Sequence, residues 1–331
     1  MIITRAPFRI SFVGGGSDLK DYYSQREGAV LSTTINKYIY ISSHYFFDID
    51  KILIKYSKTE IVSHYNEIIH PIFREVLKQF NIKGALEISS NADVPAGSGL
   101  GSSSAFTVCL LHNMYTRFRK FISKNQLSEE ACDIEINRLF EPIGKQDQYA
   151  TAYGGLNIIR FQTSETVNIE PLCLNQKTFE KLQKNLLMFF IGNVRKTSSI
   201  LTEQKQNMLL SEKLDNLKEM VSLVEDCKKA LYSNDLENFG YILHKNWSLK
   251  QRLASKITDD NINSIYNKGL KAGAIGGKLL GAGAGGFLLF YCEEKHHQRL
   301  RNTMSLFPEM KFKFENEGAK IVYIGDEEYE S

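Results

Sequence analysis

The chain has 331 residues, of which 43% are hydrophobic and 24% charged, and 41 Lys and Arg residues against 38 Asp and Glu leave a formal charge of +3. This composition excludes a disordered or collagen-like protein, and the length predicts about two domains at roughly 150 residues each. The small charge is spread along the chain without a basic tract, so nucleic acid is not an expected partner.

The sequence carries no pattern typical of export or membrane insertion. Its longest apolar run, over residues 279–292, is shorter than the ~18 residues that a membrane span needs. The start lacks a charged leader followed by a long apolar stretch. The five cysteines form no CxxC pair and are odd in number, which is typical of a reduced protein. We therefore expect a cytoplasmic protein without a membrane partner.

Strands punctuated by glycine dominate the first half of the chain. Residues 2–13 and 29–45 are rich in Val, Ile, Thr and Tyr and predict long strands, and a shorter strand is expected over 85–91. A helix is predicted over 103–119. Its side chains are apolar on nearly every face, which indicates a buried helix.

A second helix is predicted over residues 128–140, because Ser128 is a suitable N-cap and two glutamates follow it in the first turn. The apolar stripe of this helix places Glu135 at the edge of the buried face. A carboxylate in that position is costly without a partner.

The second half has a different character. A strand is predicted over residues 186–191 and a long amphipathic helix over 202–231. A Gly/Ala-rich turn is expected over 272–286, followed by a strand over 287–292. A helix–strand pair then ends near residue 324.

The strongest chemical signal is a segment in which three alternating glycines lead into three serines and a helix. Glycine permits tight turns and close approach of the backbone, and a helix start offers free N–H groups and a positive dipole end. The segment is suited to phosphate oxygens, and its hydroxyls to Mg²⁺, although a capped glycine loop is the plain alternative. It is not a Walker A loop, since it lacks GK[ST]. It reads Pro95-Ala96-Gly97-Ser98-Gly99-Leu100-Gly101-Ser102-Ser103-Ser104-Ala105.

Two polar segments are further candidates. Gly14-Gly15-Gly16-Ser17-Asp18 follows the first strand and forms either a turn or a pocket in which Asp18 accepts hydrogen bonds from sugar hydroxyls. Residues 144–149, with the sequence GKQDQY, form a polar island that is either a solvated loop or part of a site.

A third glycine cluster, over residues 281–286, fits the GxGxxG pattern literally. It precedes a predicted strand, whereas a dinucleotide site needs a strand before the motif and a helix after it. Glycines that let the backbone pack beneath a neighbouring loop are the structural alternative.

Taken together and in this order, the segments resemble those of the GHMP kinases, a family of sugar and metabolite kinases. Residues 6–18 resemble its first motif, 95–105 its phosphate loop, which is the most specific match, and 279–287 its third motif. Within the family, GGGSD, GKQDQY and GGKLLGAG are similar to the segments of D-glycero-D-manno-heptose 7-phosphate kinases. Those enzymes phosphorylate the anomeric hydroxyl of a heptose phosphate used for surface polysaccharide.

The resemblance implies a two-domain α+β fold. Its N-terminal domain would be like domain 2 of ribosomal protein S5 and its C-terminal domain ferredoxin-like, with the active site in the cleft between them. We place the boundary near residue 165, although no linker marks it. This gives an N-terminal kinase domain, 1–165, with the phosphate loop at 95–105, and a C-terminal domain, 166–331, with the Gly-rich motif at 276–287.

The resemblance also implies ATP, Mg²⁺ and direct in-line transfer without a phospho-enzyme. Ser103 and Glu135 would supply a hydroxyl and a carboxylate to Mg²⁺. Asp147 would face the acceptor hydroxyl, as a general base or as an orienting charge, and Arg9 would place a cation near the phosphates. The nucleotide would contact Pro95, Gly97, Ser98, Gly99, Leu100, Gly101, Ser102 and Ser103, and the sugar phosphate Gly15, Gly16, Ser17, Asp18 and Arg195, the last beside Lys196.

Two other functions remain open at this point. The acceptor could be an unphosphorylated sugar of the galactose or fucose type, although galactokinases carry GEHTDY where this chain has GGGSDL. A non-catalytic sensor of sugar and nucleotide is the other alternative, and the presence of Ser103, Glu135 and Asp147 argues against it. A homodimer is compatible with the sequence.

Overall fold

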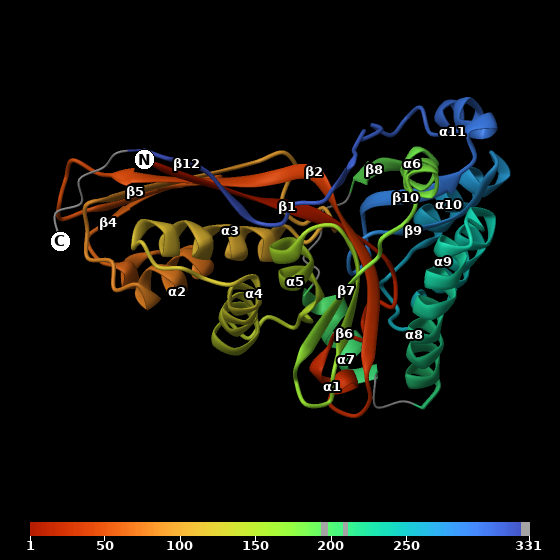
Figure 1. Cartoon of the computed structure of the whole chain (residues 1–331), viewed down its shortest axis with the longest axis horizontal. Coiled ribbons are helices and arrows are strands. Elements are labelled where there is room, and N and C mark those ends of the chain that lie inside the picture. Colours follow the sequence, from red (N-terminus) through yellow and green to blue (C-terminus); the bar gives the residue numbers. More distant parts are fainter. Residues whose placement is uncertain (193–197, 208–210, 326–331) are drawn as a thin grey trace.

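The computed structural model describes residues 1–192, 198–207 and 211–325, which form a larger and a smaller sheet with helices packed against both (Figure 1). The strands are β1 (Ile2–Val13), β2 (Gly28–Tyr45), β3 (Ile52–Lys55), β4 (Thr59–Val62), β5 (Leu86–Ala92), β6 (Leu156–Phe161), β7 (Val167–Pro171), β8 (Leu186–Gly192), β9 (Ala274–Leu279), β10 (Gly286–Cys292), β11 (Phe314–Glu315) and β12 (Lys320–Ile324). The α-helices are α1 (Lys20–Tyr23), α2 (Pro71–Gln79), α3 (Ser102–Arg117), α4 (Lys124–Cys132), α5 (Gln146–Tyr153), α6 (Gln176–Lys184), α7 (Ser198–Asn207), α8 (Ser211–Tyr232), α9 (Leu236–Lys250), α10 (Asp260–Lys271) and α11 (His297–Thr303).

The 18-residue strand β2 organises the larger sheet. Strand β1 runs antiparallel along one of its edges, while β6 and β5 share the other edge, β6 along residues 28–33 and β5 along 39–45. The main strand order is β12-β1-β2-β5-β3-β4. The predictions for β1, β2 and β5 are confirmed, because β-branched and aromatic residues dominate these stretches.

The chain returns to the larger sheet near its end. Strand β12 pairs with β1, β11 pairs with β2, and β7 pairs with β6. In Figure 1 the blue β12 lies beside the red β1. The smaller sheet has the order β8-β10-β9. The division at residue 165 stays a prediction; β7, β11 and β12 follow that residue and belong to the larger sheet.

Helices α2, α3 and α4 cover one face of the larger sheet, and α9 and α10 pack against the smaller one (Figure 1). Helix α8 packs against α9 and against strands β1 and β2 of the larger sheet. Helix α3 is buried as predicted: Ala105, Val108, Cys109 and Leu111 have no exposed surface. No helix within the described ranges is long and apolar enough to cross a membrane.

The second predicted helix is wrong at its start. Helix α4 begins at Lys124, and the Ser123 hydroxyl caps it by accepting a hydrogen bond from the Gln126 N–H (3.1 Å). Ser128 lies buried inside the helix and donates to the Lys124 carbonyl (2.8 Å). After α4 the chain continues as a π-helical segment, η2 (Asp133–Arg138), which no local sequence pattern indicates.

Two predictions for the second half also change. The stretch 202–231 contains two described helices, α7 and α8, with residues 208–210 outside the described part. The expected turn over 272–286 contains strand β9. The glycines of β9 are not typical of a strand, so the sequence pattern does not predict it. They let β9 approach α9 closely, since a Cβ on Gly276 would overlap the Gly240 carbonyl oxygen.

Candidate active site

The phosphate loop joins β5 to α3 and has the backbone that its glycines predict. Gly97, Gly99 and Gly101 have φ of +74°, +87° and +75°, a region that favours glycine. Gly101 is the N-cap of α3, a 16-residue helix, so the first N–H groups and the positive dipole end of that helix face the loop. Ser103 is exposed in the first turn, whereas the side chain of Ser98 is buried.

The third glycine cluster packs directly beneath this loop. A Cβ on Gly99 would overlap the Leu280 carbonyl oxygen, and one on Gly281 would lie 2.5 Å from the Gly99 Cα. On the same face, a Cβ on Gly286 would overlap the Ser98 carbonyl oxygen. The interpretation of this cluster as a close-packing element is confirmed. The literal GxGxxG match has no dinucleotide context, because β10 follows it directly.

Three consecutive residues at the start of α5 contact three separate groups. The Gln146 N–H donates to the Asp18 carboxylate (3.3 Å), and the Gln148 side chain donates to the Glu135 carboxylate (2.7 Å). Between them, Asp147 points to a third group, because successive helical residues diverge by ~100°. The GKQDQY segment is therefore an organising helix start and not a solvated loop.

Asp147 forms a bidentate ion pair with Arg9. The Arg9 Nε lies 2.7 Å from Oδ1 and Nη2 lies 2.8 Å from Oδ2, the geometry that orients a carboxylate most firmly. The remaining guanidinium nitrogen donates to the Gly99 carbonyl (2.8 Å), and the Arg9 N–H donates to the Leu100 carbonyl (3.1 Å). The Arg9 side chain is 5% exposed and that of Asp147 is 22% exposed. Arg9 thus joins Asp147 to the phosphate loop.

Glu135 meets the start of α3. Its carboxylate accepts hydrogen bonds from the Ser103 hydroxyl (2.8 Å) and from Gln148, and the residue is only 1% exposed. Burial raises the pKa of Glu135 to about 7, against the effect of these donors. A carboxylate and a hydroxyl are hard oxygen donors of the kind that Mg²⁺ takes. The residues present therefore fit a magnesium ion that keeps several water ligands.

Asp18 lies in the turn that follows β1. Its carboxylate accepts from the Gly16 N–H (2.9 Å) as well as from Gln146, and it is buried. Burial and the nearby Asp147 charge raise the pKa of Asp18. Two accepted bonds leave further lone pairs for hydroxyl donors.

The Ser17 hydroxyl makes contacts within the turn itself. Its hydroxyl donates to the carbonyls of Gly14 (2.8 Å) and Ala29 (3.0 Å) and accepts from the Ala29 N–H (3.1 Å), and the residue is fully buried. The two carbonyls share the single hydroxyl proton, and one of the two lone pairs is used. Ser17 holds the turn against β2 through these contacts, and its expected binding of a sugar hydroxyl stays a prediction.

The region around Gly15 contains polar atoms without partners, which sequence reasoning missed. A Cβ on Gly15 would lie 3.7 Å from the Ser11 hydroxyl and 3.9 Å from the Gln146 side-chain nitrogen. The Ser11 hydroxyl and the Gln146 side-chain oxygen are buried and have no hydrogen bond within the described residues. The next residue, Gly16, packs against the buried Gln204 of α7. Buried polar atoms without partners are costly, so this lining suits a polyhydroxylated ligand.

We expect Gly144→Ala to weaken sugar binding selectively. A Cβ at Gly144 would overlap the Asp18 carboxylate and displace it, and the three atoms nearest to this Cβ all belong to Asp18. Initial-rate kinetics should show a KM for the sugar raised at least ~10-fold, equivalent to about 1.4 kcal/mol, with the KM for ATP within a factor of about two. An unchanged KM for the sugar would exclude Asp18 from its recognition.

Two buried lysines were not predicted. The Lys278 ammonium donates to the carbonyls of Ser11 (2.6 Å) and Phe12 (2.9 Å), and thereby fastens β9 to the end of β1. The Lys250 ammonium, at the end of α9, donates to the Gly281 carbonyl. Lysine is rarely buried, so its sequence position gives no warning. Arg195 and Lys196, the expected clamp for the sugar's own phosphate, lie outside the described residues.

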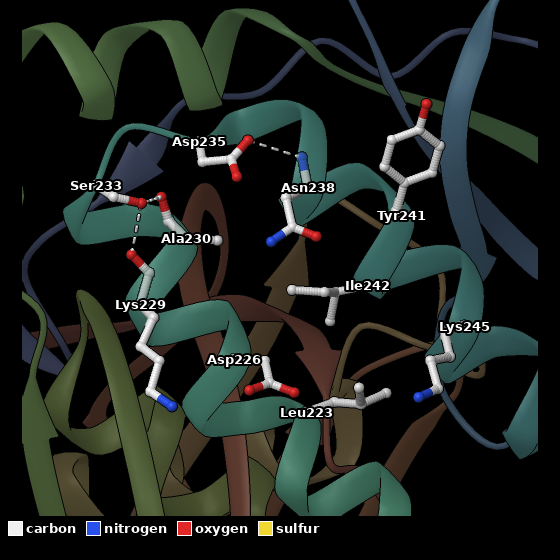
Figure 2. Close-up of a pocket in the computed structure, with 10 residues that line it drawn as sticks. All are labelled: Leu223, Asp226, Lys229, Ala230, Ser233, Asp235, Asn238, Tyr241, Ile242 and Lys245. Atoms are coloured by element: carbon white, nitrogen blue, oxygen red, sulfur yellow. Dashed lines mark hydrogen bonds between the residues drawn. The ribbon is translucent and has the colours of Figure 1, made fainter.

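A separate groove lies between α8 and α9 (Figure 2). Lys229, Asp235 and Tyr241 line it, and it contains none of the predicted site residues. It lies near the start of α9, and at ~1.5 Å per helical residue Lys250 is about 13 Å beyond Tyr241.

Comparisons with known proteins point to one family. Residues 67–155 match the model of the GHMP kinases N-terminal domain, and residues 227–307 match that of the GHMP kinases C-terminal domain. A D-glycero-alpha-D-manno-heptose 7-phosphate kinase of Campylobacter jejuni is 29% identical over 96% of this chain and 98% of the relative. An L-fucokinase/L-fucose-1-P guanylyltransferase of Bacteroides fragilis is 25% identical over 88% of this chain but only 34% of the relative.

The fold is also similar to that of solved kinase structures. The crystal structure of a D-glycero-D-manno-heptose 1-phosphate kinase from Bacteroides thetaiotaomicron has a TM-score of 0.81 and 24% identity, over 98% of this chain and all of that one. A mevalonate kinase structure has a TM-score of 0.74 at 18% identity. The two-domain α+β fold expected from the sequence is therefore confirmed.

Proposed function

We propose, from the premise that this chain belongs to the GHMP kinase family of ATP-dependent kinases, that it phosphorylates D-glycero-D-manno-heptose 7-phosphate. The γ-phosphate of ATP would pass to the anomeric C1 hydroxyl and give the 1,7-bisphosphate. The similarity to the Campylobacter jejuni kinase over nearly the full length of both chains supports this acceptor. We further propose that the reaction takes place in the cytoplasm, where ATP is made and the five cysteines remain unpaired.

The observation that carries the proposal is the Arg9–Asp147 pair. Arg9 orients the Asp147 carboxylate, which is the proposed proton acceptor. Arg9 also donates to the Gly99 carbonyl of the phosphate loop. Phosphoryl transfer requires that the acceptor oxygen and the γ-phosphate meet in line, so a rigid link between the two binding elements supports transfer between ligands on either side of it.

In the proposed mechanism, loop N–H groups between Gly97 and Ser102 bind the nucleotide phosphates; Pro95 has no N–H and contributes only a contact. Asp18 and the free polar atoms beside Gly15 hold sugar hydroxyls. Asp147 accepts the proton of the C1 hydroxyl while that oxygen forms its bond to the γ-phosphorus and the bond to the β-phosphate oxygen breaks, releasing ADP. Arg9 offsets negative charge that develops on the transferred group.

Ser103 and Glu135 are the residues that would hold Mg²⁺, whose chemistry when bound is to neutralise charge on the nucleotide phosphates. Ser103→Ala should therefore raise the Mg²⁺ concentration that gives half-maximal rate several-fold, roughly as the loss of one ligand interaction predicts. Titration of the rate with MgCl₂ at saturating ATP measures this. Ser102→Ala is the matched control for the Mg²⁺ requirement, because the Ser102 hydroxyl accepts from the Gly97 N–H, whereas the Ser103 hydroxyl donates to Glu135. An unchanged Mg²⁺ requirement in Ser103→Ala would mean that Ser103 does not bind Mg²⁺ and serves only at the start of the helix.

The test of the acceptor is a panel of sugars and sugar phosphates incubated with ATP and Mg²⁺, with products identified by mass. D-glycero-D-manno-heptose 7-phosphate should gain one phosphate and galactose and L-fucose should not. Reaction of free sugars only would replace this acceptor with one of the fucose or galactose type. Nucleotide binding without transfer to any member would favour a sensor.

A further inference from the structure

The Lys250 ammonium is a buried cation that the mechanism above does not use. The side chain comes from the last turn of α9 and is 7% exposed, and its one hydrogen bond within the described residues is to the neutral Gly281 carbonyl. A buried ammonium has three donors and is costly without an anionic partner. By contrast, the Lys278 ammonium has two carbonyl partners that explain its position.

A chain of contacts connects Lys250 with the phosphate loop and with the Arg9–Asp147 pair. Lys250 binds the Gly281 carbonyl, and the backbone of Gly281 packs on that of Gly99 in the phosphate loop. The Gly99 carbonyl in turn accepts from Arg9, which pairs with Asp147. Lys250 therefore reaches the phosphate loop from the side of the smaller sheet, opposite β1.

The surrounding charges agree with this position. Burial and the Arg9 charge lower the pKa of Lys250 to about 8, whereas Asp18 and Asp147 act to raise it. The ammonium thus lies within electrostatic reach of the proposed proton acceptor and of the proposed sugar-binding carboxylate. No ion pair joins Lys250 to either carboxylate in the described structure, so its positive charge remains available to a ligand.

We propose that Lys250 is a catalytic residue whose ammonium binds the phosphoryl group during its transfer from ATP to the sugar. The proposal rests on the proposed kinase function and adds a second cation to it. Arg9 would approach the transferred group from β1 and Lys250 from α9, so that the charge on its oxygens is offset from both halves of the chain.

The sugar's own phosphate is the other anion that this ammonium could bind. Position favours the transferred group, because Lys250 contacts the segment that packs on the phosphate loop. The two sources differ in kinetics: a contact to the transferred group lowers kcat, whereas a contact to the resident phosphate of the acceptor raises the KM for that acceptor.

The test compares Lys250→Met and Lys250→Arg with Lys245→Met, an exposed lysine on the same helix that pairs with Glu219. We expect Lys250→Met to lower kcat at least ~100-fold, the loss typical of one donor to a developing anion. The KM for ATP should change less than about threefold, and Lys245→Met should keep the wild-type rate. Lys250→Arg should recover part of the loss.

A pH profile separates catalysis from a structural role. The wild-type kcat/KM should fall above pH of about 8 as Lys250 loses its proton. The charges that act on this titration are those of Arg9 and Lys278, which favour loss of the proton, and those of Asp18 and Asp147, which oppose it. Lys250→Arg should lack this alkaline limb. If Lys250 served only as a structural contact to Gly281, wild type and Lys250→Arg should have the same pH profile.

A binding measurement completes the test. Lys250→Met should bind ADP with aluminium fluoride, a mimic of the transferred group, at least ~10-fold more weakly than wild type, and a non-hydrolysable ATP analogue with nearly unchanged affinity. Equal loss for both nucleotides, an effect on the acceptor KM alone, or a wild-type kcat would overturn the proposal. If the wild-type protein transfers phosphate to no sugar, the proposed function fails, and the two binding affinities still report on Lys250.

Discussion

Asp147→Asn is expected to lower kcat by at least ~100-fold, within the range that acid–base groups contribute. Asparagine keeps the shape of the side chain and one acceptor for Arg9 but cannot take the proton of the acceptor hydroxyl. The Arg9 contact to the Gly99 carbonyl remains, so the phosphate loop should keep its conformation. Steady-state kinetics with the sugar phosphate, together with the Kd of an ATP analogue, measure the two effects separately.

Asp226→Asn provides the surface control, because Asp226 is an exposed acid of α8 that lines the separate groove. It should have wild-type kinetics. A near-wild-type rate for Asp147→Asn would remove Asp147 from the chemistry. A large loss of nucleotide affinity would instead assign the Arg9–Asp147 pair to the support of the loop.

The second large effect is expected for Gly99→Ala. Alanine at φ +87° is strained by ~1–2 kcal/mol, and its Cβ would also overlap the Leu280 backbone. Because both contacting segments are backbone, neither can rotate away. We expect a decrease of about 3 kcal/mol or more in the free energy of unfolding, from strain and overpacking combined, and a raised KM for ATP.

Gly192→Ala isolates the strain from the overlap. Gly192 has φ +78°, and a Cβ there would meet nothing within 4 Å. Urea denaturation of both variants should show a loss of ~1–2 kcal/mol for Gly192→Ala and a clearly larger loss for Gly99→Ala. Equal losses would mean that the third glycine cluster does not support the phosphate loop.

Local sequence patterns predicted the parts of this site that depend on local backbone. Alternating glycines before a serine-rich helix start determine a loop conformation by themselves, and the loop has the expected φ angles. The bounds of strand β1 match the prediction, because its Ile, Thr, Phe and Val residues favour a strand and a glycine turn ends it. The pairing of Arg9 with Asp147 joins residues 138 positions apart, so only the family resemblance could anticipate it.

The remaining parts depend on packing between distant segments. Ser128 is a good N-cap by composition, yet Ser123 lies at the true helix start and Ser128 is buried. Strand β9 escaped notice because its glycines serve the contact with α9 rather than a turn. Lys250 and Lys278 resemble surface lysines until the tertiary structure encloses them.

The position of β12 has a consequence for biosynthesis. The outer edge of β1 at residues 2–5 pairs with residues 320–324, almost the last part of the described chain to be translated. A ribosome-bound nascent chain therefore carries an unfilled strand edge at least until residues 320–324 have been made, the kind of surface that recruits chaperones or seeds aggregates.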